Sequence, residues 1–252
     1  MQRQQWQNRQ AAAQAVAVLA DPVFKANDPR LGGNTLQANA GDLSQLDSLI
    51  RNSCGDFERL PHTATEAEQI LALVPDAQEF SALGFEANYA TATSPRLSNY
   101  QIVHFATHGC IQDNPLLSNL ALSFFDANGQ EAKTSLLKLQ DIYNLELNAD
   151  LVVLSACQTG TGKEVQGEGV VGLTRGFMYA GARRVTVSLW SVNDRATASL
   201  MSDYYQHMLE EGLDPAAALR KAQLAMWQSE SYRAPYYWAA FTLQGDWGTS
   251  RH

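Results

Sequence analysis

The chain has 252 residues, of which 45% are hydrophobic and 17% charged, enough to bury a sizeable core. Its net charge of −8 at pH 7 argues against a general nucleic-acid binder, because such a protein needs a basic surface to displace counterions. Three cysteines, Cys54, Cys110 and Cys157, make a disulfide framework unexpected and indicate a reducing, cytoplasmic setting.

The N-terminal residues allow two interpretations. Two arginines followed by an Ala-rich run that ends at Ala20 have features of a signal peptide. However, Gln14 interrupts the apolar run, and residues 15–20 also fit a first buried strand. We favour the strand, and the run is too short to cross a membrane, so no membrane association is expected.

The next segment is expected to be irregular. Residues 21–62 are rich in Asp, Asn, Gly and Pro, which is typical of a long surface excursion. Thr63 and Glu66 have the spacing of a capping box, so a helix is expected to follow them and to stop at Pro75.

The remaining elements alternate between apolar strands and amphipathic helices. We expect strands within residues 100–106, 119–130, 151–155, 183–192 and 236–245, and helices within residues 135–147, 169–180, 197–212 and 216–227, with a turn at Asn128-Gly129 and a cap at Asp214. This order predicts an α/β three-layer sandwich, in which a mostly parallel sheet carries helices on both faces. We expect one domain over residues 15–245, with tails at residues 1–14 and 246–252.

Two of the predicted strands end in residues capable of chemistry. Sites in parallel sheets lie beyond the carboxyl ends of the strands, and there His108 follows one strand and Cys157 another. If these two strands are neighbours in the sheet, they lie about 5 Å apart, and the two side chains would face each other across one cleft. An imidazole raises the thiolate fraction of a cysteine and protonates a leaving amine. The amides of Gly109 and Cys157 are candidates for an oxyanion hole.

Structural interpretations of the same residues remain open. A lone cysteine at a strand end is more often a small buried hydrophobe, and a lone histidine there is more often structural. His104 is expected in the core or cleft wall, His207 at the surface, and Cys110 as a packing residue without a partner. The histidines and cysteines are too dispersed for a zinc site, and we expect no cofactor. A phosphate loop is disfavoured because Glu164 follows Lys163 where Ser or Thr is required.

Four stretches carry a family likeness: HFATHG, LVVLSACQTGTG, GEGVVGLTRGFMYAGARRV and SLWSVND. Together they resemble the CHAT family of caspase-like domains, which are often joined to tetratricopeptide (TPR) repeats in bacteria. The likeness covers roughly residues 15–245 and implies a caspase-like sheet and a cysteine endopeptidase with a His108–Cys157 dyad. It also implies a protein or peptide substrate and a TPR-containing regulator or activator. No third triad member is visible, and a backbone carbonyl is a candidate to orient His108.

The same likeness implies a wall for the pocket that receives the P1 side chain of the substrate. That wall would comprise Trp190, Ser191 and Asp194 with Ser155, which replaces the Gln of the caspase signature Gln-Ala-Cys-x-Gly. This replacement and the added Thr159 put a caspase-like preference for Asp in doubt.

Two acidic residues also have structural interpretations. An acidic side chain at Asp194 would favour Arg or Lys at P1, whereas the competing interpretation makes Asp194 the cap of a helix that begins near Arg195. Glu168 is expected to stabilise the N-terminus of the following helix.

A second function comes from a different class. The chain would keep the fold and bind a protein partner as a catalytically latent adaptor or scaffold. A reactive thiol at Cys157 discriminates between the two functions.

Overall fold

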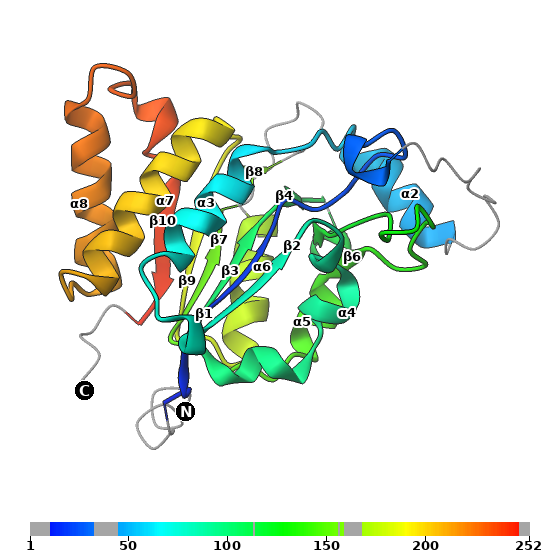
Figure 1. Cartoon of the computed structure of the whole chain (residues 1–252), viewed down its shortest axis with the longest axis horizontal. Helices are drawn as coiled ribbons and strands as arrows, with labels where there is room; N and C mark the ends of the chain where they lie inside the picture. Colours follow the sequence, from blue (N-terminus) through cyan, green and yellow to red (C-terminus); the bar gives the residue numbers. More distant parts are fainter. Residues whose placement is uncertain (1–10, 33–44, 113, 156, 159–167, 247–252) are drawn as a thin grey trace.

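The computed structural model describes residues 11–32, 45–112, 114–155, 157–158 and 168–246. A six-stranded sheet with the order β10-β9-β7-β3-β1-β2 lies at its centre (Figure 1). Its strands are β1 (Gln14–Ala20), β2 (Glu79–Leu83), β3 (Tyr100–Ala106), β7 (Leu151–Leu154), β9 (Arg184–Ser188) and β10 (Phe241–Gly245). All neighbours are parallel except β10, which is antiparallel to β9, so the predicted mostly parallel sheet is confirmed. The edge strand β2 was not predicted.

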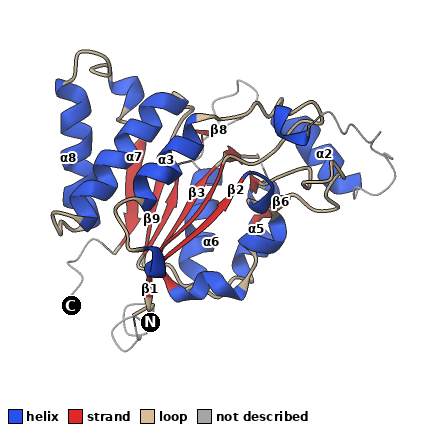
Figure 2. Ribbon diagram, in the orientation of Figure 1, coloured by secondary structure: helices blue, strands red, loops and turns tan. Residues whose placement is uncertain are grey.

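Helices cover both faces of this sheet, as predicted (Figure 2). One face packs against α3 (His62–Leu71), α7 (Asp194–Leu209) and α8 (Pro215–Gln228), and the other against α5 (Leu139–Tyr143) and α6 (Glu168–Tyr179). Side chains alternate between the two faces of a strand. Ile102 of β3 therefore lies in the core beneath α3 and α7, while Val103 lies in the core beneath α5 and α6.

A smaller sheet extends from the carboxyl ends of β3 and β7. It has the order β6-β5-β4-β8, formed by β4 (His108–Cys110), β5 (Asn119–Ala121), β6 (Leu136–Lys138) and β8 (Cys157–Gln158). Two sequence predictions are corrected here. The strand expected over residues 119–130 is only β5, and Leu136 belongs to β6, where it pairs with Ala121, rather than to a helix.

The described parts of residues 21–62, which are residues 21–32 and 45–62, are not a surface excursion. They contain α2 (Gln45–Cys54), and their apolar side chains form a separate core with β4, β5 and β6. Phe24, Ile50 and Phe57 are buried in this core against Phe124. The remaining helices are short: α4 (Tyr89–Ala92) and the 3-10 turns Pro29–Leu31, Asp76–Gln78, Gly84–Glu86, Pro95–Asn99, Pro115–Leu117 and Pro235–Tyr237. None of the described helices is both long and apolar enough to cross a membrane.

The capping box predicted at Thr63 and Glu66 is absent. Helix α3 already begins at His62, and both predicted box residues are buried inside it. Thr63 Oγ1 instead accepts a hydrogen bond from the amide of Asp21, 3.0 Å away, at the end of β1. The predicted cap at Asp214 is confirmed, since its carboxylate accepts from two amides in the first turn of α8.

Cys54 and Cys110 form a disulfide, which corrects the expectation that Cys110 packs without a partner. The bond joins the last residue of α2 to the last residue of β4, and both cysteines are buried. An odd cysteine count gave no signal for this pairing, because the two residues meet only through tertiary packing. The argument for a reducing compartment, which assumed unpaired cysteines, therefore no longer holds.

Candidate active site

The two predicted dyad residues lie opposite each other on neighbouring strands. Strands β4 and β8 are parallel, with His108 paired to Cys157 and Gly109 paired to Gln158. The two strands extend the β3–β7 pair of the main sheet, in which Phe105 is paired to Leu154. The expectation that the two strands are neighbours is thus confirmed at the level of the backbone.

The imidazole of His108 is oriented by a backbone carbonyl, which agrees with the expectation from the sequence. Its Nε2 lies 2.6 Å from the carbonyl oxygen of Glu58. A carbonyl only accepts, so Nε2 carries the proton and Nδ1 is the basic atom of the neutral ring. Nδ1 is buried and has no hydrogen-bond partner among the described residues. The ring is therefore in the tautomer that can accept a proton at Nδ1.

Aromatic side chains surround His108 and shift its titration. The ring is 4% exposed, and its centroid lies 5.1 Å from that of Phe24 and 5.5 Å from that of Phe57. Burial lowers the pKa of His108, and the hydrogen bond to the Glu58 carbonyl opposes this in part. The surroundings therefore favour the neutral imidazole, the form that acts as a general base.

The segment that carries the Glu58 carbonyl is anchored on both sides. On its N-terminal side stands the disulfide of Cys54, whose partner Cys110 shares β4 with His108. On its C-terminal side, Arg59 makes two hydrogen bonds to the buried carboxylate of Asp21, at 2.9 and 2.8 Å. The sequence did not predict the role of Glu58, because every residue has a backbone carbonyl and the residue type does not indicate which one accepts a hydrogen bond from His108.

Two residues of the expected pocket wall are accessible at a strand end. Trp190 and Ser191 follow β9, the strand next to β7, and both are exposed. The indole nitrogen of Trp190 donates to the carbonyl oxygen of Tyr236 at 3.2 Å, which ties this segment to the turn before β10. These two side chains are therefore accessible at the same end of the sheet as His108 and Cys157.

Ser155 faces the interior of the protein. It is buried, and its hydroxyl lies 3.2 Å from Nε2 of His104, which is itself fully buried on β3. His104 is therefore a core residue, which was one of the two roles expected for it.

Asp194 contacts a different helix from the one that it was expected to cap. The N-cap of α7 is Asn193, whose side chain accepts from the amide of Ala196, so the interpretation of Asp194 as the cap is wrong by one residue. Asp194 Oδ2 accepts from the amide of His62 at 3.0 Å, the first residue of α3. Burial raises the pKa of Asp194, and this hydrogen bond opposes the shift.

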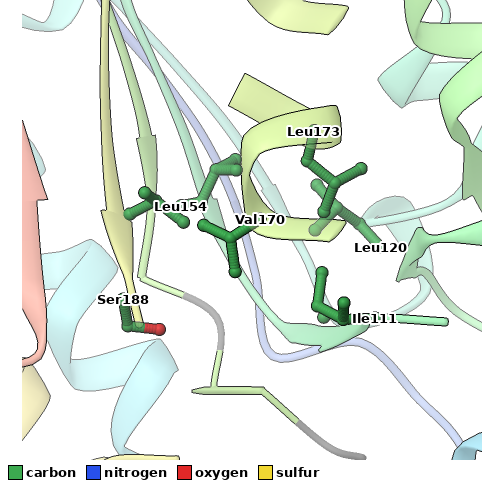
Figure 3. A pocket seen from close by; sticks show the side chains of 8 residues that line it. Ile111, Leu120, Leu154, Val170, Leu173 and Ser188 are labelled. Carbon is green, nitrogen blue, oxygen red and sulfur yellow. The ribbon is translucent and has the colours of Figure 1, made fainter. Parts of the chain in front are cut away.

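A small apolar cavity borders Gly109 between α6 and the strand ends (Figure 3). Its volume is about 20 Å³, and it is lined by Gly109, Ile111, Leu120, Leu154, Val170, Leu173, Val187 and Ser188. That volume suits about one water molecule and lies far below the several hundred Å³ of a ligand pocket. The cavity therefore does not define a substrate site.

Two expectations concern the chain after Cys157. Helix α6 begins at Glu168, in line with the expected place of this residue at a helix N-terminus. Lys163 and Glu164, on which the phosphate-loop alternative depends, lie outside the described residues.

Comparisons with known proteins give one family and a few relatives. The model of the CHAT domain family matches residues 1–246. Tetratricopeptide repeat protein 28 from Mus musculus and from Homo sapiens are each 39% identical over 110 residues, which is 44% of this chain and 4% of the relative. The chain thus spans a small part of these relatives. The Drosophila initiator caspase Dronc aligns with a TM-score of 0.45 and 8% identity, covering 94% of this chain and 81% of that chain.

Proposed function

Because the chain belongs to the CHAT domain family, we propose that it is a cysteine endopeptidase with His108 and Cys157 as its catalytic dyad. The observation that carries the proposal is the pairing of these two residues across β4 and β8. A second observation supports it, since the histidine is held with Nδ1 as its basic atom.

The proposed reaction needs only groups of this chain and water. Nδ1 of His108 takes the proton of the Cys157 thiol, and the resulting thiolate attacks the scissile carbonyl carbon. The amides of Gly109 and Cys157 stabilise the oxyanion. The imidazolium then protonates the leaving amine, and a thioester to Cys157 remains. Water, deprotonated by His108, hydrolyses the thioester and regenerates the thiol.

A thiol-directed probe tests this proposal. Without reductant, Cys54 and Cys110 are protected as a disulfide, so Cys157 is expected to take the label alone. Peptide mapping by mass spectrometry locates the label, and Cys157→Ala is expected to remove it together with cleavage of a peptide library. An unlabelled Cys157 in a folded protein, or labelling confined to Cys54 and Cys110, argues against the peptidase.

The second function is a latent module that binds a protein partner. The observation in its favour is that the matched relatives are named tetratricopeptide repeat proteins, and TPR segments mediate protein contacts. We propose a TPR-containing regulator in either case. An inert Cys157 together with retained binding of a TPR segment would favour the adaptor, whereas cleavage stimulated by that segment would favour a regulated peptidase.

For substrate selection, we propose that Trp190 and Ser191 contact the P1 side chain and that Asp194 contributes mainly by fixing α3. Replacing Asp194 by Ala is expected to lower the free energy of unfolding by about 0.5–2 kcal/mol, since the α3 amide loses its acceptor. P1 preference, measured with a peptide library, is expected to stay unchanged.

Asp194→Asn provides the matched control, because it keeps an acceptor oxygen and removes the charge. If both variants lost a preference for Arg or Lys at P1, Asp194 would be shown to contact the P1 side chain, against this proposal.

A further inference from the structure

A buried polar cluster lies beneath the residues that lead to Cys157. It consists of Glu66 on α3, His104 on β3, Ser155 after β7 and Tyr205 on α7, of which Ser155 is 4% exposed and the others 0%. These four side chains come from four elements of the fold. The proposed reaction uses none of them.

His104 lies at the centre of this cluster. Its Nδ1 is 2.9 Å from the Tyr205 hydroxyl, and its Nε2 is 3.2 Å from the Ser155 hydroxyl. Glu66 Oε1 is 2.9 Å from the same Nε2, at ion-pair distance but without the alignment of a hydrogen bond. Both ring nitrogens thus have polar neighbours, and Glu66 and Ser155 share one of them.

Burial makes the position of Glu66 energetically unfavourable for an isolated carboxylate. A buried carboxylate without a compensating positive charge or proton costs several kcal/mol. Neither carboxylate oxygen of Glu66 has a hydrogen-bond partner among the described residues, and His104 is its ion-pair partner. The pair is electrically neutral as carboxylate and imidazolium, or as carboxylic acid and imidazole. Replacing a buried ion pair by hydrophobic residues of similar volume often leaves stability unchanged or raises it. Packing alone therefore does not account for Glu66 and His104.

Helix α3 holds Glu66 in a fixed place relative to the strand ends. Its first residue, His62, donates its amide to Asp194, which follows β9. Its second residue, Thr63, accepts from the amide of Asp21, which follows β1. The first turn of α3 is therefore hydrogen-bonded to the segments that follow β9 and β1. Glu66 adds a contact with a third strand, β3, through His104.

We propose that Glu66 is a positioning residue for Cys157. Through His104 it holds the hydroxyl of Ser155, two residues before Cys157 in the chain, and thereby the place of Cys157 opposite His108. The kinetic part of this inference rests on the proposed peptidase function, whereas the effect on the reactivity of the Cys157 thiol does not.

The test compares Glu66→Gln with Glu68→Gln, the same change at an exposed position on the same helix. The first readout is the second-order rate of Cys157 alkylation by iodoacetamide from about pH 5 to about pH 9, and the second is kcat/KM for a cleaved peptide. We expect Glu66→Gln to lower both by about 10-fold to about 100-fold, because small displacements of a reacting group have effects of this size. Glu68→Gln is expected to match the wild type.

Ser155→Ala keeps the inference falsifiable if Glu66→Gln does not fold, since it removes only the buried hydroxyl. It is expected to slow alkylation of Cys157 while thermal unfolding remains cooperative. Wild-type alkylation rates at every pH in a folded Glu66→Gln or Ser155→Ala variant would overturn the inference. A wild type that is alkylated but cleaves no peptide would count against the proposed function, and the alkylation rates of the variants would still decide the role of Glu66.

Discussion

Replacing His108 by Gln is expected to lower kcat/KM for a cleaved peptide by about 10²-fold to about 10⁴-fold, the usual contribution of a general acid–base group. Glutamine can still donate to the Glu58 carbonyl, but it offers no basic atom in place of Nδ1. The loss should therefore be in chemistry rather than in the fold. Initial rates over a range of peptide concentrations give the measurement, with circular dichroism to confirm the fold.

His207→Gln is the matched control, since it makes the same substitution at a half-buried histidine on α7, far along the chain from β4 and paired with Glu211 just after the helix. It is expected to retain wild-type kcat/KM. A His108→Gln enzyme with wild-type kcat/KM would show that His108 is not the base. Cleavage restored by added imidazole would support the assignment.

The pH dependence of the same residue follows from its burial. We expect NMR titration in a Cys157→Ala background, where no thiolate contributes, to give His108 a pKa below the ordinary value of about 6.5. Because the folded pKa is lowered, the unfolded chain binds the proton more readily. His108 therefore contributes its full stability above about pH 6.5 and loses it as the pH falls. A pKa above 6.5 would contradict the proposed effect of the aromatic surroundings.

The elements of this fold that depend on short, local sequence patterns were predictable. The apolar runs that form β3 and β7 place His108 and Cys157 just beyond two strand ends. Parallel strands present their carboxyl ends at one edge, so both residues were expected at that edge. That β3 and β7 are neighbours was a condition of the prediction, and the sheet order of the structure meets it. Helix α8 was predictable for a similar reason, because Asp214 and Pro215 are adjacent start signals.

The failures share a different cause. Thr63 and Glu66 match a capping box, but their partners lie elsewhere in the fold, Asp21 just after β1 and His104 on β3, so tertiary burial overrode the local pattern. Residues 21–62 look like a loop by composition, yet Phe24 and Phe57 are needed to enclose His108. The Glu58 carbonyl has no sequence signal at all. What sequence reasoning missed is therefore the support around His108 rather than the position of His108 and Cys157 at two strand ends.

The disulfide belongs to this support, and its removal is expected to have the largest effect on stability. The bond closes a loop with a sequence separation of 56, and cross-links of this kind contribute about 2–4 kcal/mol by restricting the unfolded chain. The double variant Cys54→Ser/Cys110→Ser should lose about this much free energy of unfolding in a urea titration. Cys157→Ser is the control, because it makes the same change at the thiol outside the bond and should unfold as the wild type does.

Activity should fall with the disulfide even where the protein remains folded. Cys54 and Cys110 lie outside Glu58 and His108 in the chain, so without the disulfide the segment after α2 loses its covalent tie to β4. It keeps the Arg59–Asp21 hydrogen bonds, the ion pairs of Lys25 with Asp56 and Glu58, and its apolar packing. Amide hydrogen exchange at residues 55–60 should accelerate in the double variant, and kcat/KM should decrease. A dithiol reductant, which is oxidised as it converts the disulfide to two thiols, should reproduce both effects in the wild type and leave the double variant unchanged. Unaltered exchange and kcat/KM in the double variant would mean that the aromatic packing of Phe24 and Phe57, together with the contacts of Arg59 and Lys25, holds His108 without help from the disulfide.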